Sequence, residues 1–285
     1  MSNLVNKIDF AVIISAKNAN PNGDPLNGNR PRENYDGFGE ISDVCIKRKI
    51  RNRLQDMGQE IFVQSDERRT DGFRSLKDRA EGCAELKKAS KDKEQYATIA
   101  CEKWIDVRSF GQVFAFKAGE DNSVSIGIRG PVSIHSAVSI SPIEISSMQI
   151  TKSVNGETGK DPDKKSADTM GMKHRVEFGV YVIYGSINTQ LAEKTGFSQE
   201  DAERIKKALI TLFENDCSSA RPDGSMEVHK VYWWQHNTKT GQYSSAKVHR
   251  TLAIDAENIC DVESIKNNIR IEPLKGLSVE EYDGI

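Results

Sequence analysis

The 285-residue sequence lacks any apolar run near the roughly 18 to 20 residues that a membrane-spanning helix needs. Its first residues, MSNLVNKIDF, show neither the basic start nor the apolar stretch of a signal peptide. We therefore expect a soluble, cytoplasmic protein that has no membrane partner.

Cysteine is also scarce, and its spacing forms no metal motif. The five cysteines are widely spaced, without a Cys-x-x-Cys pair that would suggest a zinc site or a redox centre. The five histidines are scattered, with no recognisable nucleophile or metal-ligand spacing. We expect buried thiols, no metal and no cofactor, and we treat catalysis as the rival class of function.

The formal net charge of −2 hides a strong segregation of charge. The segment SDVCIKRKIRNR (42–53) holds five basic residues and one acid, whereas residues 255–285 hold eight acids and three basic residues. The local field acts on a ligand, so the small total does not argue against a nucleic-acid partner.

Hydrophobic periodicity predicts six main elements. Alternating apolar residues predict strands at 8–15, 126–140, 176–182 and 227–235, and helical stripes predict helices at 43–57 and 199–213. The second strand is expected to bend near Gly130 and Pro131, and Ser198 with Asp201 resembles a capping box. The order strand, helix, strand, strand, helix, strand predicts an α+β, ferredoxin-like (RRM-like) fold with two polar insertions.

Trp233 and Trp234 are adjacent on one predicted strand, so their side chains point to opposite faces of the sheet. We therefore expect at most one of them in the core of a one-sided sheet. The other would cover a helix or contact a neighbouring subunit.

The stretch KNANPNGDPLNGNRPRENYDG (17–37) follows the first strand and is long for a connection. Glycines let backbone N–H groups approach a phosphate oxygen, and Asn side chains donate hydrogen bonds without adding charge. On the residues alone, a flexible surface loop with turn chemistry is the simpler alternative.

Several longer motifs carry a resemblance to a known family. They are NANPNGDPLNGNRPR (18–32), DVCIKRKIRN (43–52), DVRSFG (106–111), SIGIRGPVSI (125–134) and MGMKHRVEFGVY (170–181). In this order, and over residues 8 to about 255, the sequence resembles the backbone subunit of the type I-C CRISPR Cascade complex, the Cas seven (Csd two) family of the RAMP superfamily.

The resemblance implies a hand-shaped subunit that polymerises along one CRISPR RNA and presents it for pairing with target DNA in antiviral defence. A helical fingers insertion and a thumb hairpin would decorate the palm, and the thumb would kink the guide at regular intervals. The implied division is palm 1–57, fingers 58–123, palm 124–145, thumb 146–173, palm 174–255 and an acidic C-terminal tail 256–285. Implied partners are copies of the chain, a Cas five-type subunit, the large subunit and, indirectly, a recruited helicase-nuclease.

With this resemblance, RNA contact becomes the leading interpretation of the polar and basic residues. The expected RNA-binding residues are Asn20, Asn22, Gly23, Asn27, Gly28, Arg30, Arg32, Lys47, Arg48, Arg51, Arg108, Arg129, Lys152, Lys173 and His174. Lys47, Arg48 and Arg51 lie away from the apolar stripe of their helix and have few nearby acids, so we expect them to face phosphates together. We also expect their substitution to leave fold stability nearly unchanged; a merely solvated charged face is the alternative.

For the remaining candidate residues, and for the function of the chain, the sequence leaves more than one role open. Arg108 and Arg129 could grip phosphates or pair with carboxylates of the fold. Met148, Met170 and Met172 could wedge between bases or pack the thumb hairpin onto the palm. As alternatives to a non-catalytic scaffold, the chain could be a CRISPR-associated endoribonuclease, with His174 as general acid or base, or a single-strand RNA binder that does not assemble.

Overall fold

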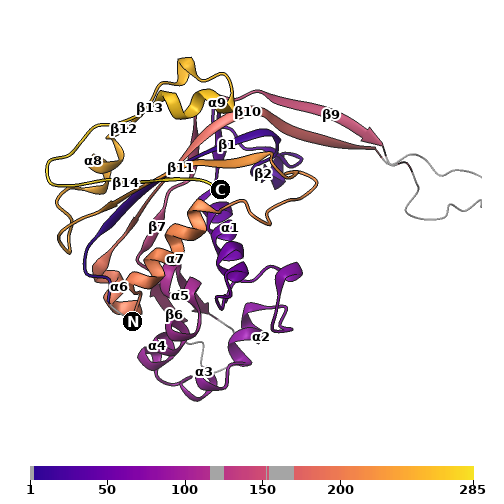
Figure 1. The fold of residues 1–285 in the computed structure, drawn as a ribbon. Helices are drawn as coiled ribbons and strands as arrows, with labels where there is room; N and C mark the ends of the chain where they lie inside the picture. Colours follow the sequence, from indigo (N-terminus) through magenta and orange to yellow (C-terminus); the bar gives the residue numbers. More distant parts are fainter. Residues whose placement is uncertain (1–2, 116–124, 152, 154–169) are drawn as a thin grey trace, which may run out of the picture.

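The structure is a computed structural model that describes residues 3–115, 125–151, 153 and 170–285 (Figure 1). Eight strands form one antiparallel sheet: β1 (Ile8–Ala19), β4 (Phe38–Ile41), β7 (Val132–Ile134), β8 (Ala137–Pro142), β9 (Ile145–Thr151), β10 (Met170–Ile187), β11 (Met226–Gln235) and β14 (Glu280–Asp283). Its path runs β14-β11-β1-β10-β8-β4, with β7 and β9 also paired to β10. The helices around this sheet are α1 (Asp43–Asp56), α6 (Thr189–Thr195), α7 (Gln199–Ile210), α8 (Ser245–His249) and α9 (Val262–Ile265). The expected α+β class is confirmed.

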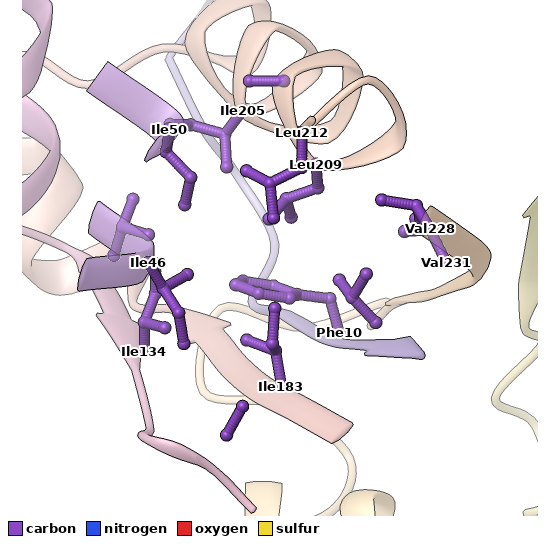
Figure 2. Close-up of a cluster of buried hydrophobic side chains, with 14 of the residues drawn as sticks. Phe10, Ile46, Ile50, Ile134, Ile183, Ile205, Leu209, Leu212, Val228 and Val231 are labelled. Atoms are coloured by element: carbon purple, nitrogen blue, oxygen red, sulfur yellow. The ribbon is translucent and has the colours of Figure 1, made fainter. Parts of the chain in front are cut away.

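Helices α1 and α7 cover one face of the sheet. Alternating residues of β1 point into this layer, and Figure 2 shows Phe10 at the centre of a cluster that includes Ile46 and Ile50 of α1 and Leu209 of α7. The Phe10 ring also stacks on Trp233 of β11, with the ring centroids 5.6 Å apart. The apolar periodicity of both helices is therefore explained by one shared core.

Side-chain caps fix the first turns of these two helices. The Ser42 side chain accepts a hydrogen bond from the backbone N–H of Cys45 at the start of α1. Ser198 and Asp201 form a reciprocal capping box at the start of α7, which confirms the expectation from sequence.

The second face of the sheet is also covered, by residues that follow β11. Ile265 and Leu277 pack with Trp234 in a second apolar cluster, and β14 pairs with β11 at the sheet edge. Both Trp233 and Trp234 are consequently buried. The expectation of a one-sided sheet was wrong, because the acidic C-terminal segment folds back onto its own sheet. A small pair of strands, β12 (Leu252–Ile254) and β13 (Ile269–Ile271), completes this layer.

The charged insertion after α1 has a core of its own. Its elements are α2 (Leu76–Glu81), α3 (Ala84–Lys88), α4 (Lys93–Lys103), α5 (Ile105–Phe110), β5 (Gly111–Ala115) and β6 (Ser125–Arg129). Phe62, Trp104 and Phe114 pack at its centre. Cys83 and Cys101 are buried there as expected, whereas Cys217 and Cys260, elsewhere in the chain, are exposed.

The predicted long strand at 126–140 is in fact broken. Its first part, β6, pairs with β5 of the insertion, and only β7 and β8 join the main sheet. The break falls at Gly130, where the backbone crosses Gly111 so closely that a Cβ on Gly130 would lie 2.2 Å from the carbonyl oxygen of Ser109. Two glycines therefore permit the chain to leave one sheet and enter another.

Strand β10 continues past the sheet and pairs with β9 to form a projecting two-stranded ribbon (Figure 1). Most of the expected thumb between these strands, residues 154–169, lies outside the described residues. Within the described part of the chain, the helices are all too short or too polar to cross a membrane.

Candidate nucleic-acid interface

The Asn/Gly/Pro stretch forms a defined hairpin. Strand β2 (Gly23–Asp24) pairs with β3 (Arg30–Pro31), and a 3₁₀ turn at Pro25–Asn27 ends at Gly28, which has a φ of 57°. The Asp24 carboxylate accepts from the backbone N–H of Leu26 at 3.2 Å. Turn chemistry therefore orders this loop and presents its tip to solvent.

The expected loop contacts divide into internal and exposed residues. Asn20 is buried, and its Nδ2 donates to the backbone oxygen of Asn29 at 2.7 Å. The Oδ1 of Asn22 accepts from both the N–H and the hydroxyl of Ser42 at 2.9 Å. Gly23 faces the Asn29 side chain, which would collide with a Cβ. These three residues build the loop and the start of α1, while the tip residues Asn27 and Gly28 are exposed.

The three predicted RNA-binding cations of α1 all have partners within the protein, and two of these partners lie outside the local sequence. Lys47 pairs with Asp43 at 2.9 Å, and Arg48 donates to the carbonyl oxygen of Val63 at 2.6 Å. Arg51 Nε donates to Oδ2 of Asp106 at 2.9 Å, and Asp106 is fully buried. The expectation that these cations have few acids nearby was wrong for Arg51, because the fold brings Asp106 to it from 55 residues further along the chain.

Arg108 and Arg129 have different surroundings in the structure, although the sequence suggested the same two possible roles for both. The buried Arg108 makes two hydrogen bonds to Asp201, of 2.9 and 2.8 Å. Burial alone would raise the pKa of Asp201, but hydrogen bonds and charge from Arg108 outweigh it and hold that pKa below its ordinary value. Of the two alternatives for Arg108, the structure shows the carboxylate pair. Arg129 is exposed at the end of β6, and Lys152 lies outside the described residues.

Strand register places the ribbon's side chains on two opposite faces. His174 lies opposite Ser147, Lys173 opposite Met148, and Met172 opposite Gln149. Directly opposed residues share a face, and the faces alternate along a strand. Met170 and Met172 therefore share the face of His174, whereas Met148 lies on the other face with Lys173. The three methionine side chains are 41 to 65% exposed, so they do not pack the ribbon onto the sheet, nor do they form one patch.

One group of side chains joins the hairpin loop to the ribbon. Arg30 Nη1 donates to the hydroxyl of Ser147 at 3.1 Å, and that hydroxyl lies 2.7 Å from Nδ1 of His174. We call Arg30, Ser147 and His174 the ribbon-base cluster. Sequence reasoning selected Arg30 and His174 and missed Ser147, because only the register of β9 against β10 places this serine beside the histidine.

The ribbon-base cluster is chemically suited to a phosphodiester. Guanidinium, imidazole and hydroxyl groups are the usual partners of phosphate oxygens and sugars. Arg32 lies beside the same hairpin and pairs with Asp24 at 3.3 Å, and Arg30 lies 3.9 Å from a carboxylate oxygen of Glu33, so both contribute partly neutralised charges. The described residues contain no group of three or more His, Cys, Asp or Glu side chains that could hold a metal ion.

The second face of the sheet is covered over β11. RNA-recognition domains stack bases on aromatic residues of an open sheet face. Here Tyr232 and Trp234 point to that face, but the C-terminal segment buries both. Together, the fold and the ribbon-base cluster define an α+β protein that presents anion-binding groups from a hairpin loop and a projecting ribbon.

Comparisons with known proteins agree with this class and identify the family. The fold is similar to a chain of a solved CRISPR RNA-guided surveillance complex in a pre-nicking state, with a TM-score of 0.52 and 15% sequence identity, over 92% of this chain and 84% of that chain. The model of the family CRISPR-associated protein Cas7 matches residues 6–272, and the chain belongs to this family.

A curated relative has the same family name. CRISPR-associated protein Cas7 of Haloferax volcanii is 28% identical over 234 residues, which is 75% of this chain. The match spans 66% of the relative's own length, just under two thirds. The resemblance seen in the sequence motifs is therefore confirmed at the level of the Cas7 family.

Proposed function

We propose that this protein is a non-catalytic, guide-RNA-binding backbone subunit of a type I-C Cascade surveillance complex. Copies of the chain would polymerise along a CRISPR RNA and present it to target DNA. The ribbon-base cluster is the observation that carries this proposal, because it unites two segments that the sequence singled out separately. The family membership and the motif resemblance support the same assignment.

We propose that the main sheet is a ferredoxin-like palm. The neighbours β11-β1-β10-β8 correspond to the spatial order fourth, first, third, second of a split βαβ fold, with α1 and α7 as its two helices. The fingers would then comprise 58–123 together with β6, because β6 pairs with β5. The thumb would be the excursion from the ribbon at 146–173.

The guide would follow the side of the molecule that carries the hairpin tip, the ribbon-base cluster and the ribbon. The C-terminal segment buries Tyr232 and Trp234 on the second face, so these two rings are not available for stacking on bases. Exposed methionines on the ribbon could then meet bases displaced from the guide. A Cas five-type subunit, the large subunit and a recruited helicase-nuclease would complete the assembly on the loaded guide.

Salt-dependent binding tests the RNA contact. Each phosphate contact that is lost lowers the slope of log affinity against log salt by roughly 0.7 for single strands. The double variant Arg30→Gln, His174→Gln should lower both slope and affinity for every sequence alike. Lys207→Gln, which removes an exposed cation of α7, is the control. Unchanged slope and affinity in the double variant would contradict this placement of the RNA.

Electron microscopy tests assembly, and incubation with labelled repeat RNA tests the scaffold against the endoribonuclease alternative. Protein mixed with guide RNA should form regular arcs or filaments, and isolated monomers would contradict a backbone role. Repeat RNA should remain intact with and without divalent metal. Cleavage that disappears in His174→Ala, at unchanged RNA affinity, would instead establish the endoribonuclease.

A further inference from the structure

Tyr35 projects into solvent from an ordered turn that follows the hairpin loop. Its side chain is fully exposed, with a relative accessibility of 109%. The Oδ1 atom of Asn34 accepts hydrogen bonds from the backbone N–H groups of Asp36 at 3.0 Å and of Phe38 at 2.9 Å, and these bonds hold the turn in one shape. An exposed aromatic side chain on an ordered support is typical of the anchor residues of protein–protein interfaces.

The charges next to Tyr35 favour a protein partner over a nucleic acid. The turn ENYDG (33–37) contains two acids and no basic residue. Arg30 lies 3.9 Å from Glu33, whereas Asp36 forms no salt bridge with any residue that the structure describes. A base stacked on Tyr35 would bring its phosphates close to carboxylates that repel them, whereas a protein surface with an unpaired cation would be attracted.

A cleft of about 370 Å³ lies between the end of α1 and the charged insertion. Ile61, Phe73 and Trp104 contribute apolar surface to its lining. Its volume is within the range of pockets that take a small organic group. The cleft is therefore suited to receive one large side chain from a partner.

The walls of this cleft are in place without a partner. The Phe73 ring lies against Gly82, where an added Cβ would be 2.2 Å from a ring carbon. Arg79 donates to both carboxylate oxygens of Asp71, at 2.5 and 3.0 Å, and to the carbonyl oxygen of Phe73 at 2.9 Å. These bonds fix the loop that carries Phe73, so little conformational entropy would be lost when the cleft is filled.

The cleft also has polar groups that suit a tyrosine flanked by acids. Lys103 belongs to the lining, with Nζ 5.7 Å from the ring centroid of Trp104, and it forms no salt bridge within the described part of the chain. The side chain of Glu60, also in the lining, has no hydrogen-bond partner among the described residues. Glu60 can accept a hydrogen bond from a phenol hydroxyl, and Lys103 can pair with a carboxylate next to the ring.

We propose that Tyr35 of one copy of the chain inserts into this cleft on the next copy, where Asp36 pairs with Lys103. Tyr35 lies on the side of the molecule that carries the ribbon, because Phe38 pairs with Pro142 just before β9. In Figure 1 the insertion that forms the cleft lies well away from the ribbon. Two different surfaces that bind each other make a head-to-tail contact, which repeats into an open filament unless its rotation closes a ring.

This inference rests on the proposed function, because it names the contact that would join copies along the guide. One side chain in a cleft buries much less than the roughly 1,200 Å² that a stable complex needs. The guide would compensate, since it holds neighbouring copies together at a high effective concentration. We therefore expect the protein to be monomeric without RNA and to assemble on a strand that holds several copies.

Sedimentation velocity measures assembly on a long single-stranded RNA that holds several copies, and fluorescence anisotropy measures binding to a short RNA that holds one copy. Tyr35→Ala should weaken the contact between copies by about thirtyfold or more, as expected for loss of an anchor residue, and leave binding to the short RNA unchanged. Val5→Ala changes another exposed apolar side chain and is the control, which should assemble like wild type.

Further variants test the cleft. Lys103→Glu and Asp36→Lys should each reduce assembly, and the double variant should restore it, because the reversed charges attract again. Thr70→Trp places a large ring in the lining of the cleft and should also prevent assembly. An equal mixture of Tyr35→Ala and Thr70→Trp retains one intact turn and one intact cleft, so it should form pairs on the long RNA but no longer arrays.

The outcomes separate this inference from the proposed function. If Tyr35→Ala assembles like wild type, or if the double variant with reversed charges assembles no better than the single variants, the contact is overturned while the RNA-binding backbone role stands. If Tyr35→Ala loses affinity for the short RNA, Tyr35 contacts RNA and the inference is also overturned. If wild type binds the short RNA but never assembles on the long RNA, the inference falls together with the proposed backbone role.

Discussion

Replacing Arg51 by Gln should destabilise the fold although the residue lies on a basic helix face. Arg51 is one of three donors to the buried carboxylate of Asp106, together with the backbone N–H groups of Phe62 at 2.7 Å and Val63 at 3.0 Å. Its guanidinium also lies 5.0 Å from the ring centroid of Phe110. The side chain is only 12% exposed, so solvent screens these interactions weakly.

The expected loss in the free energy of unfolding depends on the hydrogen bonds that Asp106 keeps after Arg51 is replaced. Removing one partner of a buried ion pair costs roughly 3–5 kcal/mol when the other charge is left alone. Asp106 keeps two backbone donors, so the loss is nearer that of one charged hydrogen bond, about 1.5–3 kcal/mol. The contact with the aromatic ring adds about 0.5–1 kcal/mol. We therefore expect Arg51→Gln to lower the free energy of unfolding by about 2–4 kcal/mol.

Urea denaturation followed by circular dichroism measures this loss, and Lys47→Gln is the matched control. Lys47 lies on the same helix and pairs with the partly exposed Asp43, so its removal should cost less than about 0.5 kcal/mol. Equal midpoints for the two variants would refute the role given to Arg51. A double variant with Asp106→Asn should cost less than the sum of the single changes, because the two residues interact.

Three further predictions concern other parts of the fold. His249 is buried, and burial lowers its pKa below the ordinary value of 6.5, so on acidification the unfolded chain binds the proton at a higher pH than the folded chain does. Stability should therefore fall as the pH is lowered from about 7 to about 5, and His249→Gln should make the urea midpoint less dependent on pH. Gly111→Ala should lower the free energy of unfolding by more than about 2 kcal/mol, because φ is 80° and a Cβ would lie 2.2 Å from a carbonyl oxygen of β6. The control Gly58→Ala, at a φ of 78° with no atom within 4 Å of the added Cβ, should lower it by about 1 kcal/mol, and thermal melts compare the two. A thiol reagent at about pH 8 should modify the exposed Cys217 and leave Cys101, whose pKa burial raises to about 11, unmodified in the folded protein.

Local patterns allowed prediction of the elements but not of their long-range partners. The alternation in β1 and the capping box of α7 depend on residues a few positions apart, so they could be read directly. Arg51 and Asp106, or Arg108 and Asp201, meet only through the fold, across 55 and 93 positions of sequence. The basic segment 42–53 therefore looked almost free of acidic partners, although Arg51 has one in Asp106.

The candidate site was also predicted only in part: residues in local motifs were found, and a residue placed by strand pairing was missed. The hairpin loop and His174 carried sequence signals, whereas Ser147 joins them through strand register, which the sequence ISSMQIT (145–151), without a regular apolar alternation, does not fix. The covering of Trp234 was missed for a different reason: the acidic composition of the C-terminal segment suggested a tail, and its few buried residues, such as Ile265 and Leu277, are too sparse to form a periodic pattern.

The C-terminal strand has a consequence for synthesis of the chain on the ribosome. Of the strands in this sheet, β1 is made first and lies in the middle, between β10 and β11, whereas β14 is made after the other strands and covers the outer edge of β11. Until residues 280–283 leave the exit tunnel, a nascent chain that has already joined β11 to β1 presents an open strand edge and part of an uncovered apolar face. Open edges pair readily with other chains. A chain that ends just before residue 280 would therefore be prone to aggregate, although it would lack only the four residues of β14 from the sheet.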